Sequence, residues 1–205
     1  RDGEAYRKHL LVMDAVTGEI IFDENQVLHD ITGTLSCLGS DDSGSDECEE
    51  ELSMPFPYAR ITGGALDTYS DAEGNFTVAA SGSDPVSLSS EVRGLWFRVF
   101  NEAGAESSLA YTASPGETVA LVHNEDNDNE YYRAEVNAYV QANRVRDFTL
   151  QYNPEYPVIA SQQEFTVNVN IDDSCNAYYN GSSINFYRSG GGCSNTANSG
   201  VVHHE

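Results

Sequence analysis

Hydrophobic residues in this chain follow the two-residue period of β-strands almost throughout and the period of a helix only once. Four strand-like runs alternate with turn residues such as Gly, Asn, Asp and Ser: Tyr58–Ile61, Gly74–Ala80, Leu95–Phe100 and Thr118–Val122. Their spacing predicts an antiparallel β-sandwich over residues 27–123. Within 131–150 the apolar residues recur every three to four positions, which predicts an amphipathic helix of about four to five turns.

The sequence after this helical segment predicts further β-structure. Pro154 and Pro157 are expected to end the helix, and Glu164–Ile171 alternates as a strand does. Two short runs flank Asn180-Gly181, a strong hairpin signal: Ala177–Tyr179 and Ser183–Tyr187. Residues 194–205 are predicted to begin a second helix, with Ser194 or Asn195 as its N-cap.

Two further features divide the chain. Near the N-terminus, His9–Met13 and Glu19–Phe22 flank a turn that ends in Gly18, which predicts a β-hairpin within residues 1–26. The polar run at 124–130 is predicted to be a linker. We therefore expect a hairpin at 1–26, a sandwich at 27–123, a linker at 124–130 and a second β-rich domain at 131–205.

The charge of the chain excludes several kinds of partner. The sequence has 33 Asp and Glu residues but only 10 Lys and Arg residues, a formal net charge of −23. Nucleic acid binding needs clustered cations, so nucleic acid is not an expected partner, and binding to anionic lipid is disfavoured. No run of 18 apolar residues occurs, so we expect no membrane insertion.

Four cysteines indicate the compartment. Two sequence-local disulfides are predicted, and four free thiols are the alternative: Cys37 with Cys48, and Cys175 with Cys193. The even number of cysteines and the acidic surface favour an oxidising, extracellular setting.

Chemistry is concentrated at the end of the sequence, which reads Val201-Val202-His203-His204-Glu205. Apolar residues followed by His-Glu are how an H-E-x-x-H zinc helix begins. In that motif two histidines one turn apart bind zinc, and the intervening glutamate activates the attacking water. These five residues alone are equally compatible with solvent-exposed side chains.

The preceding residues make the pattern more specific. Asn176-Ala177-Tyr178-Tyr179, a small hairpin, a Gly-rich stretch and then the His-Glu pair resemble, in this order, the thermolysin-like and fungalysin-like secreted zinc metallopeptidases. The resemblance implies that 131–205 forms the β-rich N-terminal half of an α+β catalytic domain. It further implies that Asn176, Ala177 and Tyr178 bind a peptide or protein substrate, that His204 binds zinc and that Glu205 is the general base.

The rest of the chain resembles such precursors more loosely. Residues 1–26 are similar to the end of a propeptide, and 27–123 to carboxypeptidase-regulatory-like modules inserted in secreted bacterial proteases. The resemblance implies a mainly β protein with one or two helices, secreted and of bacterial origin. The second zinc histidine and the third ligand would lie after Glu205. We therefore expect the 205-residue chain to have no peptidase activity by itself.

Two other functions remain open. The chain could be a non-enzymatic extracellular β-protein, an adhesive module or a subunit of a surface filament that self-assembles through strand edges. It could also be an inhibitory prodomain fragment that binds the remainder of a catalytic domain.

Acidic loops suggest calcium as a second metal. Seven of the eleven residues in Asp41–Glu51 are acidic, and Asp126, Asp128 and Glu130 lie close together in sequence. Dense carboxylates suit Ca²⁺, although neither loop has EF-hand spacing. The alternative is a solvated charge run that maintains solubility.

Overall fold

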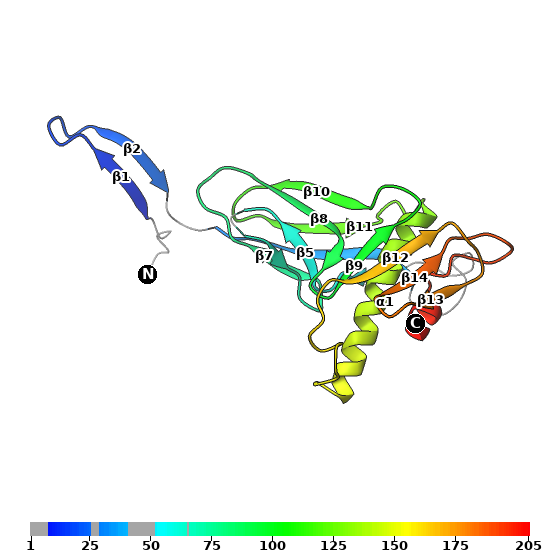
Figure 1. The fold of residues 1–205 in the computed structure, drawn as a ribbon. Helices are drawn as coiled ribbons and strands as arrows, with labels where there is room; N and C mark the ends of the chain where they lie inside the picture. Colours follow the sequence, from blue (N-terminus) through cyan, green and yellow to red (C-terminus); the bar gives the residue numbers. More distant parts are fainter. Residues whose placement is uncertain (1–7, 26–28, 41–51, 65) are drawn as a thin grey trace.

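The computed structural model describes residues 8–25, 29–40, 52–64 and 66–205, and this part of the chain is mainly β with two helices, as predicted (Figure 1). Its elements, in chain order, are β1 (His9–Met13), β2 (Ile20–Asn25), β3 (Ile31–Gly39), β4 (Leu52–Pro55), β5 (Ala59–Thr62), β6 (Thr68–Tyr69), β7 (Asn75–Val78), β8 (Val86–Gly94), β9 (Phe97–Asn101), β10 (Ser108–Ala113), β11 (Thr118–His123), α1 (Glu130–Tyr152), β12 (Phe165–Ile171), β13 (Ala177–Tyr179), β14 (Ser183–Tyr187) and α2 (Ser199–His204).

Two sheets enclose one hydrophobic core. The smaller sheet has the order β11-β3-β4, with β7 also paired to β3. The larger sheet has the order β13-β14-β12-β9-β8-β5-β6, with β10 also paired to β8. Side chains of both sheets contribute to the same core, for example Leu35 from β3 and Leu88 from β8.

The larger sheet continues across the segment predicted to be a linker. Strand β12 pairs in parallel with β9, from Phe165 opposite Phe97 to Val169 opposite Asn101. Parallel neighbours need a crossover, and α1 supplies it. The pairs β12–β14 and β11–β3 are also parallel, so the antiparallel arrangement expected from the sequence holds only for the remaining pairs.

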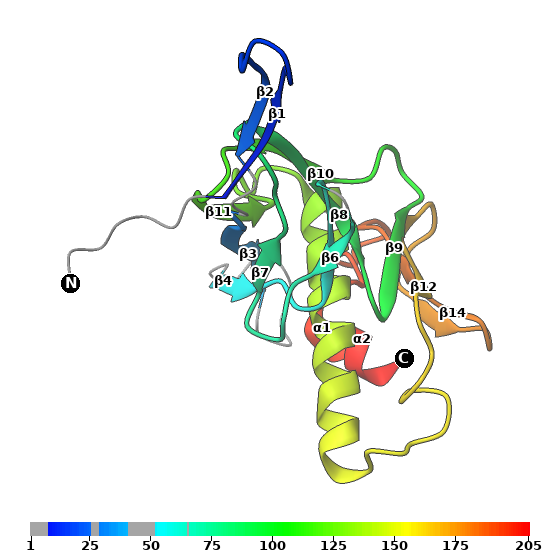
Figure 2. The same cartoon turned by 90° about the vertical axis from the view of Figure 1, so that its left-hand side faces the viewer.

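Helix α1 forms where the hydrophobic period predicted it. The Asn129 side chain caps its first turn by accepting a hydrogen bond from the Tyr131 amide, and the helix ends at Tyr152, two residues before Pro154. Its buried face packs against β9, β12 and β3. Phe148 continues the helical spacing of apolar residues within 131–150 and is therefore expected on that face, but it is 62% exposed because the last turns of α1 extend beyond the sheets (Figure 2). None of the described helices is long and apolar enough to cross a membrane.

The predicted Cys37–Cys48 disulfide is not supported, because Cys37 is a free thiol. Cys37 lies on β3, a strand that the sequence analysis did not predict, and its side chain is completely buried in the core. Burial also raises the pKa of this thiol to about 12, as expected for a cysteine that packs as a small apolar residue. Cys48 lies outside the described residues.

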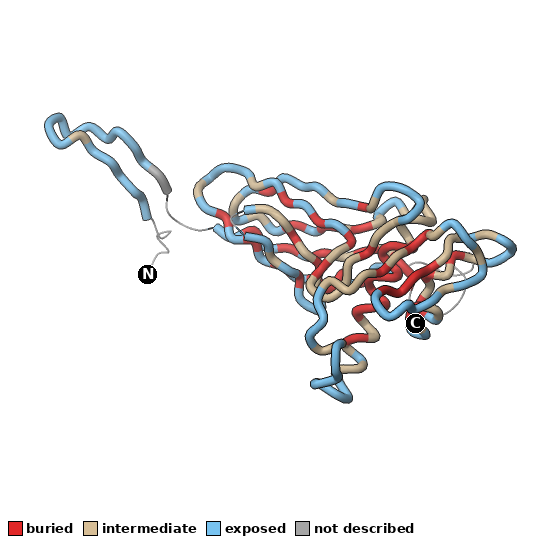
Figure 3. The backbone as a smooth tube through the Cα atoms, viewed as in Figure 1, coloured by how far each residue is buried: buried red, intermediate tan, exposed pale blue. Residues whose placement is uncertain are grey.

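The N-terminal hairpin differs from the rest of the molecule. Strands β1 and β2 pair antiparallel, and their turn uses a positive φ at Gly18, as predicted. The hairpin stands apart from the two larger sheets, and its described residues are almost all exposed (Figure 3). Its exposed apolar residues include Leu10, Val12, Ile21 and Phe22.

Gly94 provides a test of the packing between α1 and the larger sheet. A Cβ atom at this position would clash with the Tyr139 hydroxyl of α1 and with the Tyr58 carbonyl oxygen. Because the Tyr139 hydroxyl is itself held by a hydrogen bond to the Pro57 carbonyl oxygen, it has little room to move. We expect Gly94→Ala to lower the free energy of unfolding by about 3 kcal/mol in a urea titration.

Gly104→Ala is the matched control, since a Cβ there meets no atom within 4 Å and the residue does not adopt a positive φ. Equal stabilities of the two variants would contradict this packing.

Candidate functional site

The His-Glu residues lie at the end of α2, which packs against α1 (Figure 2). Asn198 caps this helix by accepting a hydrogen bond from the Val201 amide, and Val202 is buried. The helix therefore begins later than predicted, and the predicted caps Ser194 and Asn195 lie before it. The Asn195 side-chain oxygen accepts from the Ala197 amide, in the segment before the helix, and its amide nitrogen donates to Asn170 and Glu130.

The two histidines of α2 have different surroundings. His203 Nε2 lies 3.0 Å from Gln141 Oε1 on α1, and Gln141 Nε2 donates to the Ser40 carbonyl oxygen. The second bond fixes the orientation of the Gln141 amide, so His203 Nε2 is the donor. Desolvation and the nearby Arg144 charge lower the pKa of His203. The structure thus uses His203 as a structural contact.

His204 is exposed, and its imidazole makes no hydrogen bond to any described residue. The neighbouring Glu205 is partly exposed, and its amide donates to the Val201 carbonyl oxygen at 3.1 Å. The sequence prediction named His204 and Glu205, and both side chains are available to a ligand.

Strand β13 forms one end of the larger sheet and pairs only with β14 among the described strands. No described strand pairs with its other edge, whose backbone groups could therefore bind an extended peptide. Tyr178 is 38% exposed, and Ala177 is partly buried. Asn176, immediately before the strand, is exposed, and its side-chain amide makes no hydrogen bond within the described part of the chain.

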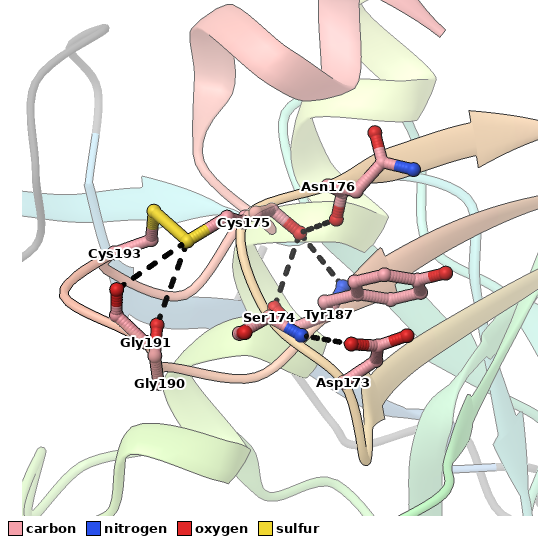
Figure 4. The surroundings of a disulfide bond; sticks show 9 residues. Asp173, Ser174, Cys175, Asn176, Tyr187, Gly190, Gly191 and Cys193 are labelled. Atoms are coloured by element: carbon pink, nitrogen blue, oxygen red, sulfur yellow. Dashed lines mark hydrogen bonds between the residues drawn. A yellow bond between two sulfur atoms is a disulfide. The ribbon is translucent and has the colours of Figure 1, made fainter.

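A disulfide joins the start of this edge to the segment before α2. Cys175 and Cys193 are bonded, as predicted, with their Cα atoms 5.3 Å apart. Cys175 Sγ lies 3.7 Å from the Gly190 carbonyl oxygen and 3.8 Å from that of Gly191, so the loop folds closely around the sulfur (Figure 4). The Asn176 side chain points away from the disulfide (Figure 4).

A chain of three asparagines connects the same segment to α1. Asn195 Nδ2 donates to Asn170 Oδ1 at 2.8 Å, and Asn170 Nδ2 donates to Asn101 Oδ1 at 3.1 Å. Asn101 Nδ2 in turn donates to the Glu135 carboxylate at 2.7 Å. Asn195 Nδ2 also donates to Glu130. Two carboxylates on α1 therefore hold both ends of this asparagine chain (Asn101, Asn170 and Asn195).

Glu130, a predicted calcium ligand, has several hydrogen-bond partners in the fold. Its carboxylate accepts hydrogen bonds from the Ser189 amide, the Ser189 hydroxyl and Asn195. Burial would raise the pKa of Glu130, but these hydrogen bonds outweigh it and lower the pKa. Asp126 and Asp128 are exposed, and the described residues contain no group of three or more His, Cys, Asp or Glu side chains that could hold a metal.

Asp126, Asp128 and Glu130 form no such group within the described part of the chain, and calcium binding by them stays a prediction. The other predicted calcium loop, Asp41–Glu51, lies outside the described residues, and calcium binding there stays a prediction.

Sequence reasoning missed Gln141 and the asparagine chain. Gln141 occupies a buried position of a helix whose apolar residues carried the prediction, so its polarity gave no positional signal. The asparagines are spread over three separate segments, and only the fold brings them together.

Comparisons with known protein families, with curated proteins and with solved structures find no match. Function is therefore inferred from the geometry of α2, of β13 and of the segment between them.

Glu135, at one end of the asparagine chain, makes stability depend on pH. Its side chain is buried, and desolvation raises its pKa from 4.5 to about 7, although hydrogen bonds from Ser107 and Asn101 act in the opposite direction. Between pH 4.5 and 7 the folded state keeps a proton that the unfolded state releases. Raising the pH from 4.5 to 7 therefore lowers the free energy of unfolding. Above pH 7 the stabilising contribution of the protonated Glu135 carboxyl is lost.

We expect the unfolding free energy of the wild type, relative to that of Glu135→Gln, to fall between about pH 4.5 and 7 and then to level. Urea titrations across this range measure the difference. A difference that is independent of pH would contradict a carboxyl with a raised pKa at this position.

Proposed function

We propose that this chain carries the peptide-binding edge and the first metal ligand of a secreted zinc endopeptidase. The observation that carries the proposal is the contrast between the two histidines of α2. Both side chains are exposed, but His203 is hydrogen-bonded to Gln141, whereas the His204 imidazole makes no hydrogen bond within the described residues and lies next to Glu205.

The donor types fit zinc in part. An imidazole and a neighbouring carboxylate suit a catalytic zinc site, which normally has three protein ligands and one open position. His204 supplies one ligand, so the proposal requires the others from outside these 205 residues. A zinc ion bound there would supply Lewis-acid polarisation of water and of the scissile carbonyl group.

The residues of the chain have separate tasks in this proposal. Glu205 accepts the proton of the attacking water and returns it to the leaving amine. The free edge of β13 binds the substrate backbone as an added strand, and the unbonded Asn176 amide is positioned at the start of that edge. Tyr178, partly exposed on the strand, contributes contact area.

Secretion is part of the same proposal. Cys175 and Cys193, which form the disulfide, are both exposed, and disulfides persist in oxidising compartments. An extracellular location also agrees with a strongly acidic chain whose substrates are peptides or proteins.

A specific observation favours a second candidate, a non-enzymatic extracellular protein that assembles through strand edges. The β1–β2 hairpin exposes apolar residues, and an isolated two-stranded sheet is at best marginally stable in water. The gene sequence after Glu205 discriminates between the candidates: two residues followed by His, and a Glu some twenty or more residues later, favour the peptidase.

The histidine pair provides the experimental test. In the protein produced in its natural host, we expect His204→Ala to lose zinc and peptide hydrolysis. His203→Ala is the matched control one residue away, and it should retain zinc because that histidine bonds to Gln141. Glu205→Gln should retain zinc while kcat falls by at least about 100-fold.

Metal analysis and peptide hydrolysis measure these outcomes. Equal zinc loss in the two histidine variants, or zinc retained in His204→Ala, would sink the proposal.

A further inference from the structure

We propose that the Cys175–Cys193 disulfide, together with Thr196, holds the edge strand β13 in position relative to α2, so that reducing the disulfide loosens the peptide-binding edge while α2 stays docked. The inference rests on the proposed function, because it assigns a regulation to the same site. Reduction of the disulfide is expected to affect substrate binding and to leave the metal ligand His204 in place.

Strand β13 is weakly held by its own contacts. It has three residues, it pairs on one side with β14, and Tyr179 is 57% exposed. Its side chains add two ring contacts: Tyr178 with Tyr187 at 6.0 Å and Tyr179 with Phe165 at 6.4 Å between centroids. A segment with so few buried contacts belongs to the part of a fold that opens first.

The disulfide closes the open end of the β13–β14 hairpin. Cys175 directly precedes Asn176, and Cys193 follows the loop after β14, so the bond encloses the whole hairpin. Cross-linking of this kind restricts the conformations available when the enclosed segment opens. The positive φ of Cys175 shows that the chain turns sharply at the point where the edge begins.

Thr196 is the non-covalent part of the same link. Its hydroxyl donates to the Asn176 carbonyl oxygen at 3.0 Å and accepts from the Tyr187 amide at 2.7 Å. It therefore ties the start of β13 and the end of β14 to a residue only three positions before the first residue of α2.

Helix α2 has anchors that do not involve the disulfide. Val202 is buried in the core, His203 bonds to Gln141, and Asn195 is fixed by Asn170 and Glu130. Loss of the disulfide leaves these contacts unchanged. The edge and the metal-binding helix therefore have separable stabilities, and the disulfide acts on the edge.

Both cysteines are exposed, so reductants can reach the bond. A dithiol would supply two electrons and two protons, the S–S bond would break to give two thiols, and the dithiol would become a cyclic disulfide. An extracellular dithiol or low-potential thiol pool would thus lower peptide affinity reversibly.

Hydrogen exchange on the 205-residue chain tests the inference without requiring catalysis. Because antiparallel pairing alternates, the Tyr178 amide faces β14 and reports on segment 177–179. We expect exchange in this segment to be about tenfold faster or more in the Cys175→Ser, Cys193→Ser double variant than in the wild type, while that of 201–204 is unchanged. Unchanged exchange at 177–179, or equal acceleration in both segments, would overturn the inference.

Two comparisons keep the test decisive if the double variant does not fold. The first is the wild type with a phosphine reductant, for which the same local acceleration is expected. The second compares two variants of Thr196. Thr196→Val removes the hydroxyl and should accelerate exchange at 177–179, whereas Thr196→Ser keeps the hydroxyl and should leave exchange there unchanged. Equal exchange in the valine and serine variants would contradict the role of Thr196.

The catalytic readout is separate. In the protein from its natural host, reduction should raise KM for peptides severalfold with kcat and zinc content nearly constant, as expected when substrate binding alone is weakened. Absence of hydrolysis in every form would reject the proposed function, while the exchange result would still decide whether the disulfide holds the edge.

Discussion

Helix α1 organises this structure because several of its buried polar side chains form hydrogen bonds to other elements. Asn137 accepts from the Ser40 amide, and Gln141 donates to the Ser40 carbonyl oxygen, which ties the end of β3 to the helix. Glu135 accepts from the Ser107 amide and fixes the loop after β9. Burying these groups without partners would be costly, so each one specifies where a neighbouring segment can lie.

The candidate site follows from the same constraint. Gln141 has one amide oxygen and one amide nitrogen, and with the nitrogen committed to Ser40 its oxygen accepts from His203. This bond anchors α2 to α1 through His203, while the His204 imidazole makes no hydrogen bond within the described residues. Glu130, in the first turn of α1, holds the loop between β14 and α2. One helix therefore positions the segment before the His-Glu pair and distinguishes the two histidines.

The sequence predicted those elements whose periodicity is local. It located α1, β12 and the β13–β14 hairpin, where proline or Asn-Gly marks the ends, and it paired Cys175 with Cys193 correctly. It missed β3, because small residues at 33, 37 and 39 face the core and give no apolar alternation. Cys37 was misassigned for the same reason. The bonds of Glu130 could not be predicted, since its partners lie about sixty residues away and only the fold brings them close.

The central claim is that His204 and Glu205 begin a zinc site whose other ligands lie outside this sequence. Intact mass and metal content, measured on one sample of the protein from its natural source, test it most directly. The account predicts a mass well above the 22.4 kDa of these residues, with about one zinc ion per chain. A mass near 22.4 kDa without zinc would contradict it and favour an assembling, non-enzymatic protein.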